Sequence, residues 1–413
     1  MKRALLEQAY AAMRHDLRRT VLTMLGMAWG IATVVLLLAY GDGFGRAIEN
    51  IFHSFGATAV GIFPNRTSEQ AGGNKAGVPI RFTSDDIELL RNTVPLVRYI
   101  ARESDKDSKV QYGSRTFTFP AWGVDPGIFE IWNLHVEDGR FLNDQDNLGH
   151  GLYAVLGWEA KQKLFSGRPA LGESIRVDGV SFQVIGVLQP RMQEGDDNIN
   201  RVVYIPFSTM DVLQDTHYLG GIWLDSQGLD HDKLTRTIRE SLGLAHGFKP
   251  TDQRAIFVFD AQKQLSQFGI ISLGLKILLA FIGTVTLGIG GVGLMNIMLV
   301  SVTQRTREIG VEKALGARKK DILFQFLAEA LVITAVGGLV GILLSYLVSF
   351  SVGTLTLYSA LAQHASAGDI QLIVSPKTLV IATAILGLVG VVSGMFPAIR
   401  AANLDPIEAL RYE

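Results

Sequence analysis

Four long apolar segments interrupt an otherwise mixed sequence, and each is long enough to cross a lipid bilayer. They cover residues 20–41, 270–301, 322–350 and 378–398. A helix rises about 1.5 Å per residue, so roughly 20 apolar residues cross about 30 Å of bilayer hydrocarbon. The pattern therefore predicts four membrane-spanning helices.

Residues 42–269 show a different pattern, in which short alternating runs are separated by turns and by polar stretches with helical spacing. Thr83, Ser84, Asp85 and Asp86 have the composition of a helix start. We expect a folded α+β domain here, outside the membrane, and helical extensions of the first two spans at 43–55 and 261–273. The expected strands are Ser174–Val177, Ser181–Val187, Arg201–Ile205 and Ile256–Phe259, and the expected helices are Ser84–Thr93 and His231–Leu242.

Positively charged residues predict the orientation of the spans, because basic loops stay on the cytoplasmic side. The loop at 302–321 is rich in basic residues, whereas the loop at 351–377 has a single lysine. Both chain ends are therefore expected in the cytoplasm, the first as an amphipathic helix over 1–19 along the membrane surface. The last, 399–413, should contain a short helix that begins at Pro406 with Asp405 as its cap. The basic residues of the 302–321 loop are Arg305, Arg307, Lys313, Arg318, Lys319 and Lys320.

The 302–321 loop also has helical spacing, with Ile309, Lys313 and Gly316 along one ridge. Gly316 is expected to end the helix, because glycine enters the left-handed region at little cost. A short helix held at the membrane surface between two spans can receive force from a soluble partner. The alternative is an ordinary positively charged loop.

Composition supports a mixed chain and excludes several kinds of chemistry. The 413 residues are 48% hydrophobic, with a mean hydropathy of +0.26 and a net charge of −1, which argues against a nucleic-acid partner. The chain has no cysteine, so disulfides and thiolate chemistry are excluded, and its eight histidines show no metal-ligand spacing. The sequence contains no phosphate-binding loop motif and no recognisable pairing of a nucleophile with a general base. We therefore expect a non-catalytic chain without a cofactor or metal of its own, and the sequence names no substrate-binding residue.

Glycines inside the apolar segments predict close packing between helices. The sequence at 288–293 matches G-x-G-x-x-G, but it lies inside an apolar segment rather than after a strand, so it does not indicate a nucleotide site. Glu329 is the single acidic residue within the predicted spans, and we expect it to pair with an arginine or lysine near the cytoplasmic edge; a role in an ion path is the alternative. The predicted packing glycines are Gly26, Gly30, Gly288, Gly290, Gly291, Gly337, Gly341, Gly390 and Gly394.

Two sets of motifs carry a family resemblance. The segments TREIGVEKALGARKKDI and FPAIRAANLDPIEALRYE resemble the permease domain of MacB-like/FtsX-like (type VII) ABC transporters. The segment YAVLGWEAKQKLFSGRPALGESIRVDGVSFQVIGVLQP resembles their periplasmic core domain. The resemblance implies a porter-like part at about 56–119 and 217–262 and a sabre-like part at about 120–216. It also implies that the 302–321 loop is a coupling helix, with the ATPase docking on Arg307, Glu308, Ile309, Gly310, Lys313, Ala314, Leu315 and Gly316.

The same resemblance predicts a function. MacB carries its ATPase in the same chain, whereas this sequence starts directly at the membrane, so we expect a separate ATPase subunit that holds ATP and Mg²⁺. A second permease copy, identical or paralogous, would complete a machine in the inner membrane that moves its periplasmic domains to export a substrate. A periplasmic adaptor and an outer-membrane channel are further expected partners. The alternatives are a lipoprotein-releasing type of permease and a membrane-anchored sensor or scaffold; an ion-driven secondary transporter is the least favoured.

Overall fold

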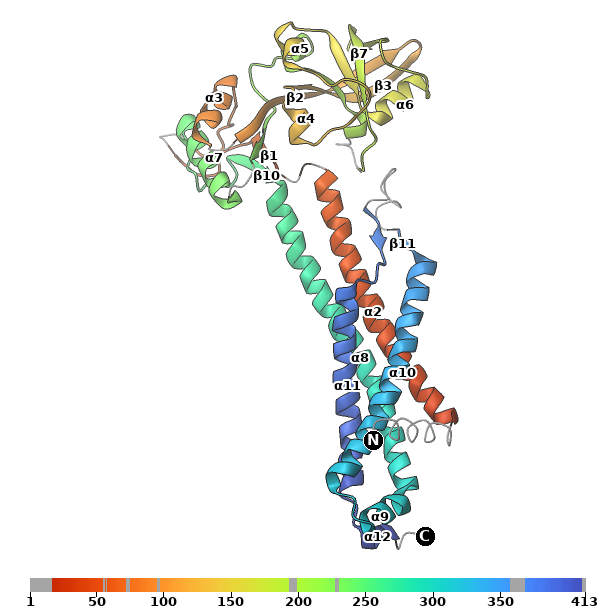
Figure 1. Ribbon diagram of the computed structural model, residues 1–413. Helices are drawn as coiled ribbons and strands as arrows, with labels where there is room; N and C mark the ends of the chain where they lie inside the picture. The colour runs from red at the N-terminus through yellow and green to blue at the C-terminus, as the bar shows by residue number, and fades with distance from the viewer. Residues whose placement is uncertain are drawn as a thin grey trace. The chain divides into compact units, whose positions relative to one another are not determined.

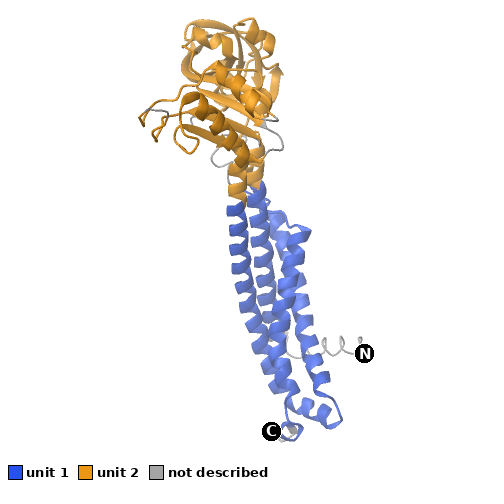
Figure 2. Ribbon diagram, turned by 90° about the vertical axis from the view of Figure 1, so that its left-hand side faces the viewer, with its two compact units in different colours: residues 1–46, 270–355, 370–413 blue, residues 47–269, 356–369 orange. Residues whose placement is uncertain are grey.

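The computed structural model describes residues 17–54, 56, 58–71, 75–94, 97–192, 199–226, 230–356 and 368–410. Two compact units make up the chain (Figure 2). One contains residues 1–46, 270–355 and 370–413, and the other contains residues 47–269 and 356–369. The amphipathic helix predicted over residues 1–19 lies almost entirely outside the described residues, as do the last three residues of the chain.

The helical unit is built on four long apolar helices, α2 (Leu17–Ser54), α8 (Ala261–Gln304), α10 (Lys319–Val352) and α11 (Pro376–Ala402) (Figure 1). Each is long and apolar enough to cross a membrane, which confirms the four predicted spans. Helices α2 and α8 are longer than a bilayer requires, and both continue through the segments predicted as helical extensions.

Two short helices and two short strands complete this unit. Helix α9 (Thr306–Ala314) lies between α8 and α10 in the chain, and α12 (Pro406–Leu410) follows α11. Figure 1 shows α9 and α12 side by side at the same end of the unit. The strands β11 (Thr354–Leu355) and β12 (Ile370–Gln371) pair in the connection between α10 and α11.

The second unit contains one ten-stranded mixed sheet with the order β10-β1-β9-β2-β3-β8-β5-β7-β4, and β6 pairs with β2 and β7. The β3–β8 and β5–β7 pairs are parallel, whereas the others are antiparallel. The strands are β1 (Ala59–Pro64), β2 (Val97–Tyr112), β3 (Arg115–Val124), β4 (Val136–Gly139), β5 (Tyr153–Leu156), β6 (Ser174–Val177), β7 (Val180–Leu188), β8 (Val203–Pro206), β9 (Gly221–Ser226) and β10 (Ile256–Asp260). The helices are α3 (Ser84–Thr93), α4 (Ile128–Ile131), α5 (Asp144–Leu148), α6 (Trp158–Phe165) and α7 (His231–His246), with 3₁₀ turns η1 (Ile199–Arg201) and η2 (Phe207–Val212).

Most of the predicted local elements are present. Strand β6 and helix α3 have the predicted bounds, and Thr83 caps α3. Asp178 and Gly179 both have positive φ, at 46° and 91°, so they form the tight turn that joins β6 to β7. One prediction is wrong: the strand expected from Arg201 begins at Val203. The side-chain amide of Asn200 forms hydrogen bonds with the backbone of residue 191. Asn200 and Arg201 therefore belong to the η1 turn that precedes strand β8, and not to the strand.

Three apolar clusters are buried in this unit, and the third, around Trp132 and Tyr204, lies between strands of both halves of the sheet. Helices α3 and α7 pack on β1, β9 and β10 around residues such as Phe82 and Leu224. Helix α6 packs on β5, β7 and β8 around Phe165 and Phe182. Strand β2 contributes to both halves, because it pairs with β9 at its start and with β3 and β6 at its end. The predicted division into porter-like and sabre-like parts stays a prediction.

Candidate functional site

The candidate site is the short helix α9 with the turn that follows it. The helix ends at Ala314, and Gly316 has a φ of 104°, which a residue with a Cβ adopts only under strain. The amide of Gly316 donates to the carbonyl of Lys313 at 3.0 Å. The predicted helix and its glycine stop are therefore present in the structure.

One face of α9 is buried against the helical unit. Ile309 is 2% exposed and belongs to an apolar core that includes Met298 of α8, Phe326 of α10 and Ala398 of α11. Gly310 is buried beside it. These contacts fix which side of α9 faces outward.

The outward face carries the other residues expected to dock the ATPase, except Lys313. Arg307, Glu308, Ala314 and Gly316 are exposed, and the side chain of Leu315 is 84% exposed. Apart from Lys313, the residues that the sequence resemblance named for ATPase docking therefore fall into two groups, one buried and one exposed. The buried members, Ile309 and Gly310, pack inward, and only the exposed members present a surface that a partner can touch; their docking role stays a prediction.

Arg305 joins the start of α9 to the third span. Its Nε donates to Oε2 of Glu308 at 3.0 Å, and its Nη1 donates to Oε2 of Glu329 at 3.3 Å. Its guanidinium also lies over the ring of Phe326, 5.6 Å from the centroid. The predicted pairing of Glu329 with a basic residue is thus confirmed, whereas the cytoplasmic position of this pair stays a prediction. The sequence did not single out Arg305, although it is the basic residue closest to the end of the second span.

Lys313 joins the end of α9 to the fourth span. Its ammonium donates to the carbonyls of Ala402 at 2.7 Å and Leu404 at 2.6 Å. Burial lowers the pKa of Lys313, and the nearby charge of Lys319 lowers it further. Both of these hydrogen bonds are internal, so Lys313 anchors the helix rather than forming part of its free surface. Sequence spacing placed it on a docking ridge because no local pattern shows where the end of α11 lies.

Helix α12 packs against α9. It begins at Pro406, and the carboxylate of Asp405 accepts a hydrogen bond from the amide of Ile407 at 2.8 Å. This is the capping arrangement that the sequence predicted. Ile407 itself is 74% exposed, so a second apolar side chain is accessible on this part of the unit.

Close approach of the long helices accounts for most of the predicted packing glycines. A Cβ on Gly341 would lie 2.4 Å from the carbonyl oxygen of Ala28, and one on Gly30 would lie 2.9 Å from Cα of Leu287. Gly26 and Gly288 are exceptions, because a Cβ there would meet nothing within 4 Å, although the carbonyl of Gly26 itself lies against Gly290. The closely packed members of the predicted set are Gly30, Gly290, Gly291, Gly337, Gly341, Gly390 and Gly394.

An ion pair that sequence reasoning missed lies at the other end of the bundle. Asp42 of α2 accepts from Nζ of Lys276 on α8 at 2.9 Å, and its second carboxylate oxygen accepts from the hydroxyl of Thr378 on α11 at 3.1 Å. Three long helices meet at this carboxylate. The available signal was that Asp42 directly follows the first predicted span while Lys276 is the single basic residue in the second.

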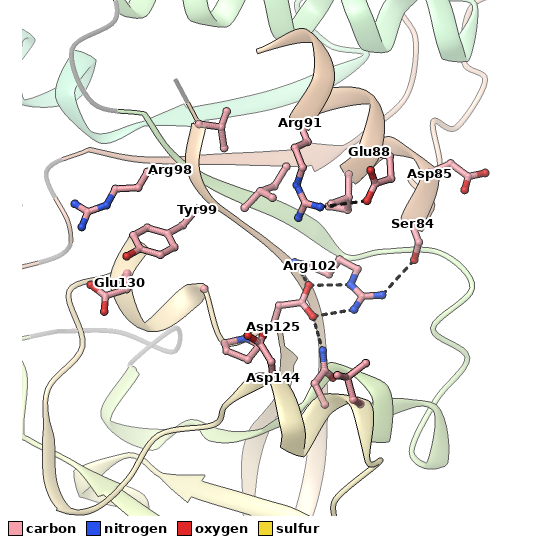
Figure 3. Close-up of a pocket in the computed structure, with 17 residues that line it drawn as sticks. Ser84, Asp85, Glu88, Arg91, Arg98, Tyr99, Arg102, Asp125, Glu130 and Asp144 are labelled. Carbon is pink, nitrogen blue, oxygen red and sulfur yellow. Dashed lines mark hydrogen bonds and ion pairs between the residues drawn. The ribbon is translucent and has the colours of Figure 1, made fainter. Parts of the chain in front are cut away.

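The outer unit contains an open cleft of about 1150 Å³ between α3, the start of β2, and α4 and α5 (Figure 3). The base of the cleft contains an ion pair, in which the guanidinium of Arg102 donates two hydrogen bonds of 2.8 Å to the carboxylate of Asp125. Asn147 donates a third hydrogen bond of 2.8 Å to the same carboxylate, and we call this three-residue cluster the clasp. The rim carries charges of both signs, including Arg98 and Glu130 (Figure 3). A concave surface of this size exceeds most small-molecule sites, which are about 300–1000 Å³.

The described residues hold no group of three or more histidines, aspartates or glutamates placed to bind a metal ion. What they do hold is a set of spanning helices, an anchored surface helix and a large folded domain between the first two spans. This arrangement defines a multi-pass membrane protein with an extracytoplasmic domain.

Comparisons with known proteins identify the family. Residues 20–237 match the MacB-like periplasmic core domain, and residues 280–406 match the FtsX-like permease C-terminal domain. The chain belongs to the family of MacB-like, FtsX-like ABC transporter permeases.

Two relatives and one solved structure illustrate the similarity. The macrolide export ATP-binding/permease protein MacB of Bdellovibrio bacteriovorus is 31% identical over 99% of this chain, which spans 61% of that protein. The uncharacterised ABC transporter permease YknZ of Bacillus subtilis is 31% identical over 96% of this chain and 95% of its own length. The periplasmic region of MacB from Actinobacillus actinomycetemcomitans aligns with 54% of this chain and 97% of its own, at 19% identity and a TM-score of 0.43.

Proposed function

We propose that this chain is the permease subunit of an ABC transporter in which a separate ATPase subunit docks on α9. ATP-driven movement of the ATPase would shift α9, and the spanning helices would pass that movement to the extracytoplasmic domain. The observation that carries the proposal is the division of α9 into an anchored face and an exposed tip. Leu315 is 84% exposed there, and Arg307 and Arg318 of the same loop are also exposed.

The contacts of the spans favour transmission of movement over conduction of an ion. Secondary transporters place ionisable groups along a path through the membrane. In the described part of this chain, Glu329 is engaged by Arg305, and Asp42 is engaged by Lys276 at the opposite end of the bundle. Each of these carboxylates therefore has a structural partner at one end of the helices. This arrangement favours helices that transmit movement over helices that pass an ion from one carboxylate to the next.

The remaining expectations belong to the same proposal. The chain would act without catalysis or a cofactor of its own, with ATP and Mg²⁺ held by the ATPase. Two permease copies would assemble in the inner membrane, with their large domains in the periplasm. Export is the direction we propose, because a relative matched over 99% of this chain is named a macrolide exporter. A periplasmic adaptor and an outer-membrane channel would extend such a machine.

Copurification tests the docking surface. Burying Leu315 in an interface contributes about 2 kcal/mol, and an aspartate there would instead place a charge in it. We expect the wild-type chain, coexpressed with candidate ABC ATPase subunits from the same genome, to retain one of them, and Leu315→Asp to lose that ATPase by about 100-fold or more.

Leu244→Asp is the matched control, because Leu244 is 88% exposed on α7 in the other unit. It should retain the ATPase at the wild-type level. Equal retention by Leu315→Asp would overturn the proposed docking surface.

The absence of cysteine allows a direct test of topology. Single Leu315→Cys and Leu244→Cys variants should react with a membrane-impermeant maleimide from opposite sides of the membrane. Reaction from the same side would contradict the whole arrangement.

A further inference from the structure

Helix α11 is held by polar contacts at both of its ends, although it is covalently continuous with neither α9 nor the outer domain's sheet. At its C-terminal end, Lys313 of α9 donates to the carbonyls of Ala402 and Leu404. The last carbonyls of a helix lack partners within it and carry partial negative charge, so an ammonium is a strong partner for them. A movement of α9 must therefore displace the end of α11 or break these bonds.

At its N-terminal end, α11 is bonded to the first span. Thr378 is 2% exposed, and its hydroxyl donates to Oδ2 of Asp42 at 3.1 Å. Ser375, the N-cap residue of α11, accepts from the amide of Thr378 at 3.1 Å, and its hydroxyl lies 2.8 Å from the threonine hydroxyl. The side chain of Thr378 is thus oriented by the N-cap of its own helix, α11, and its hydroxyl contacts the carboxylate of Asp42 on α2.

Asp42 is in turn held on α2 at a point of close approach. Lys276 of α8 bonds to its other oxygen at 2.9 Å. A Cβ on Gly41 would lie 2.9 Å from Cγ of Lys276, and one on Gly45 would lie 2.9 Å from Oγ of Ser272. The two helices that lead to the outer domain, α2 and α8, are therefore joined here, and Thr378 connects α11 to that joint.

Between its two ends, α11 is packed closely against other spans. A Cβ on Gly394 would lie 2.6 Å from Cβ of Ala330, and one on Gly390 would lie 2.8 Å from Cγ2 of Thr334. The hydroxyl of Ser393 faces Gly291 of α8. A helix of 27 residues is about 40 Å long, so α11 reaches from one joint to the other, with Pro397 as its one internal proline near the Lys313 end.

We propose that α11 is the connecting element of the transport cycle, with Lys313 as its joint to the coupling helix and Thr378 as its joint to Asp42. Movement of α9 is then transmitted to α11 at one end and delivered to α2 and α8 at the other. The inference rests on the proposed function, because it needs a motor at α9. It competes with a direct route in which α9 moves α8, its neighbour in the chain, and α11 has no part.

Substitutions at the two joints separate these routes. Lys313→Met removes the donors while keeping an unbranched side chain, and Thr378→Val removes the hydroxyl while keeping the shape. Lys313→Arg and Thr378→Ser retain hydrogen-bonding groups and should restore function. Matched controls are Lys320→Met, on an exposed lysine at the start of α10, and Thr383→Val, on an exposed threonine of α11 itself.

The readout is the distance between two probes in the full chain purified with its ATPase. Cysteines replace Leu244 of the outer unit and Phe350 of α10, which are 88% and 92% exposed, and the chain offers no other cysteine. The distance is measured by energy transfer with and without ATP and vanadate. ATP hydrolysis is measured on the same samples, so that retention of the motor is known for every variant.

We expect Thr378→Val, which lies at the other end of the bundle from α9, to bind the ATPase and hydrolyse ATP within about twofold of wild type, and both Thr378→Val and Lys313→Met to lose most of the change in probe distance per ATP hydrolysed. The conservative variants and the controls should keep that change. If both joint variants move the probes as wild type does, the direct route is correct and the proposal is overturned. If the wild-type chain retains no ATPase, the proposed function itself fails, and the connecting role fails with it.

Discussion

Replacing Gly341 with alanine tests the packing of the third span against the first. The added Cβ would lie 2.1 Å from Cγ2 of Ile31 and 2.4 Å from the carbonyl oxygen of Ala28. The isoleucine can change rotamer, but the carbonyl belongs to the backbone of α2, so α2 and α10 must move apart. Overpacking of this kind costs about 1–3 kcal/mol.

Gly288→Ala is the control, because a Cβ there would meet no heavy atom within 4 Å. Alanine is favoured over glycine in a helix by up to about 1 kcal/mol, so this variant should be as stable as wild type or more stable. The propensity gain is common to both positions, so the free energies of unfolding of Gly341→Ala and Gly288→Ala should differ by the overpacking cost alone, about 1–3 kcal/mol.

Unfolding in mixed micelles with an increasing fraction of sodium dodecyl sulfate, followed by circular dichroism, measures this difference at high dilution. Equal unfolding midpoints for Gly341→Ala and Gly288→Ala would refute the reasoning, since they would show that α2 and α10 do not approach as closely as the structure has them.

Three further predictions concern charged groups. Arg305→Met should destabilise the helical unit by about 2–4 kcal/mol, because it leaves the buried carboxylate of Glu329 without its partner; Glu329→Gln should cost less in the same unfolding assay, since the arginine it frees is partly exposed. Burial raises the pKa of Asp252, but hydrogen bonds from Ser68 and from backbone amides outweigh it and lower the pKa from 3.8 to about 2. That group should therefore stabilise the outer unit by about 2 kcal/mol above pH 4, an amount lost as the pH falls towards 2; Asp252→Asn should abolish this part of the pH dependence of urea unfolding followed by tryptophan fluorescence. Asp125→Asn should weaken the clasp in the floor of the cleft, lowering the urea midpoint of the outer unit by an amount equivalent to about 1–3 kcal/mol; an unchanged midpoint would show that the clasp adds nothing to stability.

Patterns that depend on local spacing were predictable from the sequence. The four spans follow from length and apolarity, the turn at Asp178 and Gly179 from its residue types, and the caps of α3 and α12 from side chains within one helical turn. Each of these features is decided within a few residues, or by the simple exclusion of charge from lipid.

Contacts between distant segments were not predictable in the same way. Lys313 and Leu404 are 91 residues apart, and Asp42 and Thr378 are 336 residues apart. Helical spacing could place Lys313 on a ridge of α9, but whether that ridge faces a partner or the end of another span depends on how the bundle packs. The short helix and its glycine stop were therefore predictable as a segment, whereas the division of its residues into buried anchors and free surface required the structure.

Strand β2 has a mechanical consequence for the outer domain. Its 16 residues belong to the hydrogen-bond ladders of β9 near the start and of β3 and β6 near the end, so a single strand joins the two halves of the sheet, and a shared apolar cluster that includes Ala101 of β2 packs across them. A force along β2 would act on many of its interstrand hydrogen bonds at the same time. Bending of one half of the sheet relative to the other would require β2 itself to bend or to lose some of these bonds. The two halves are therefore expected to move together rather than to bend about a hinge between them.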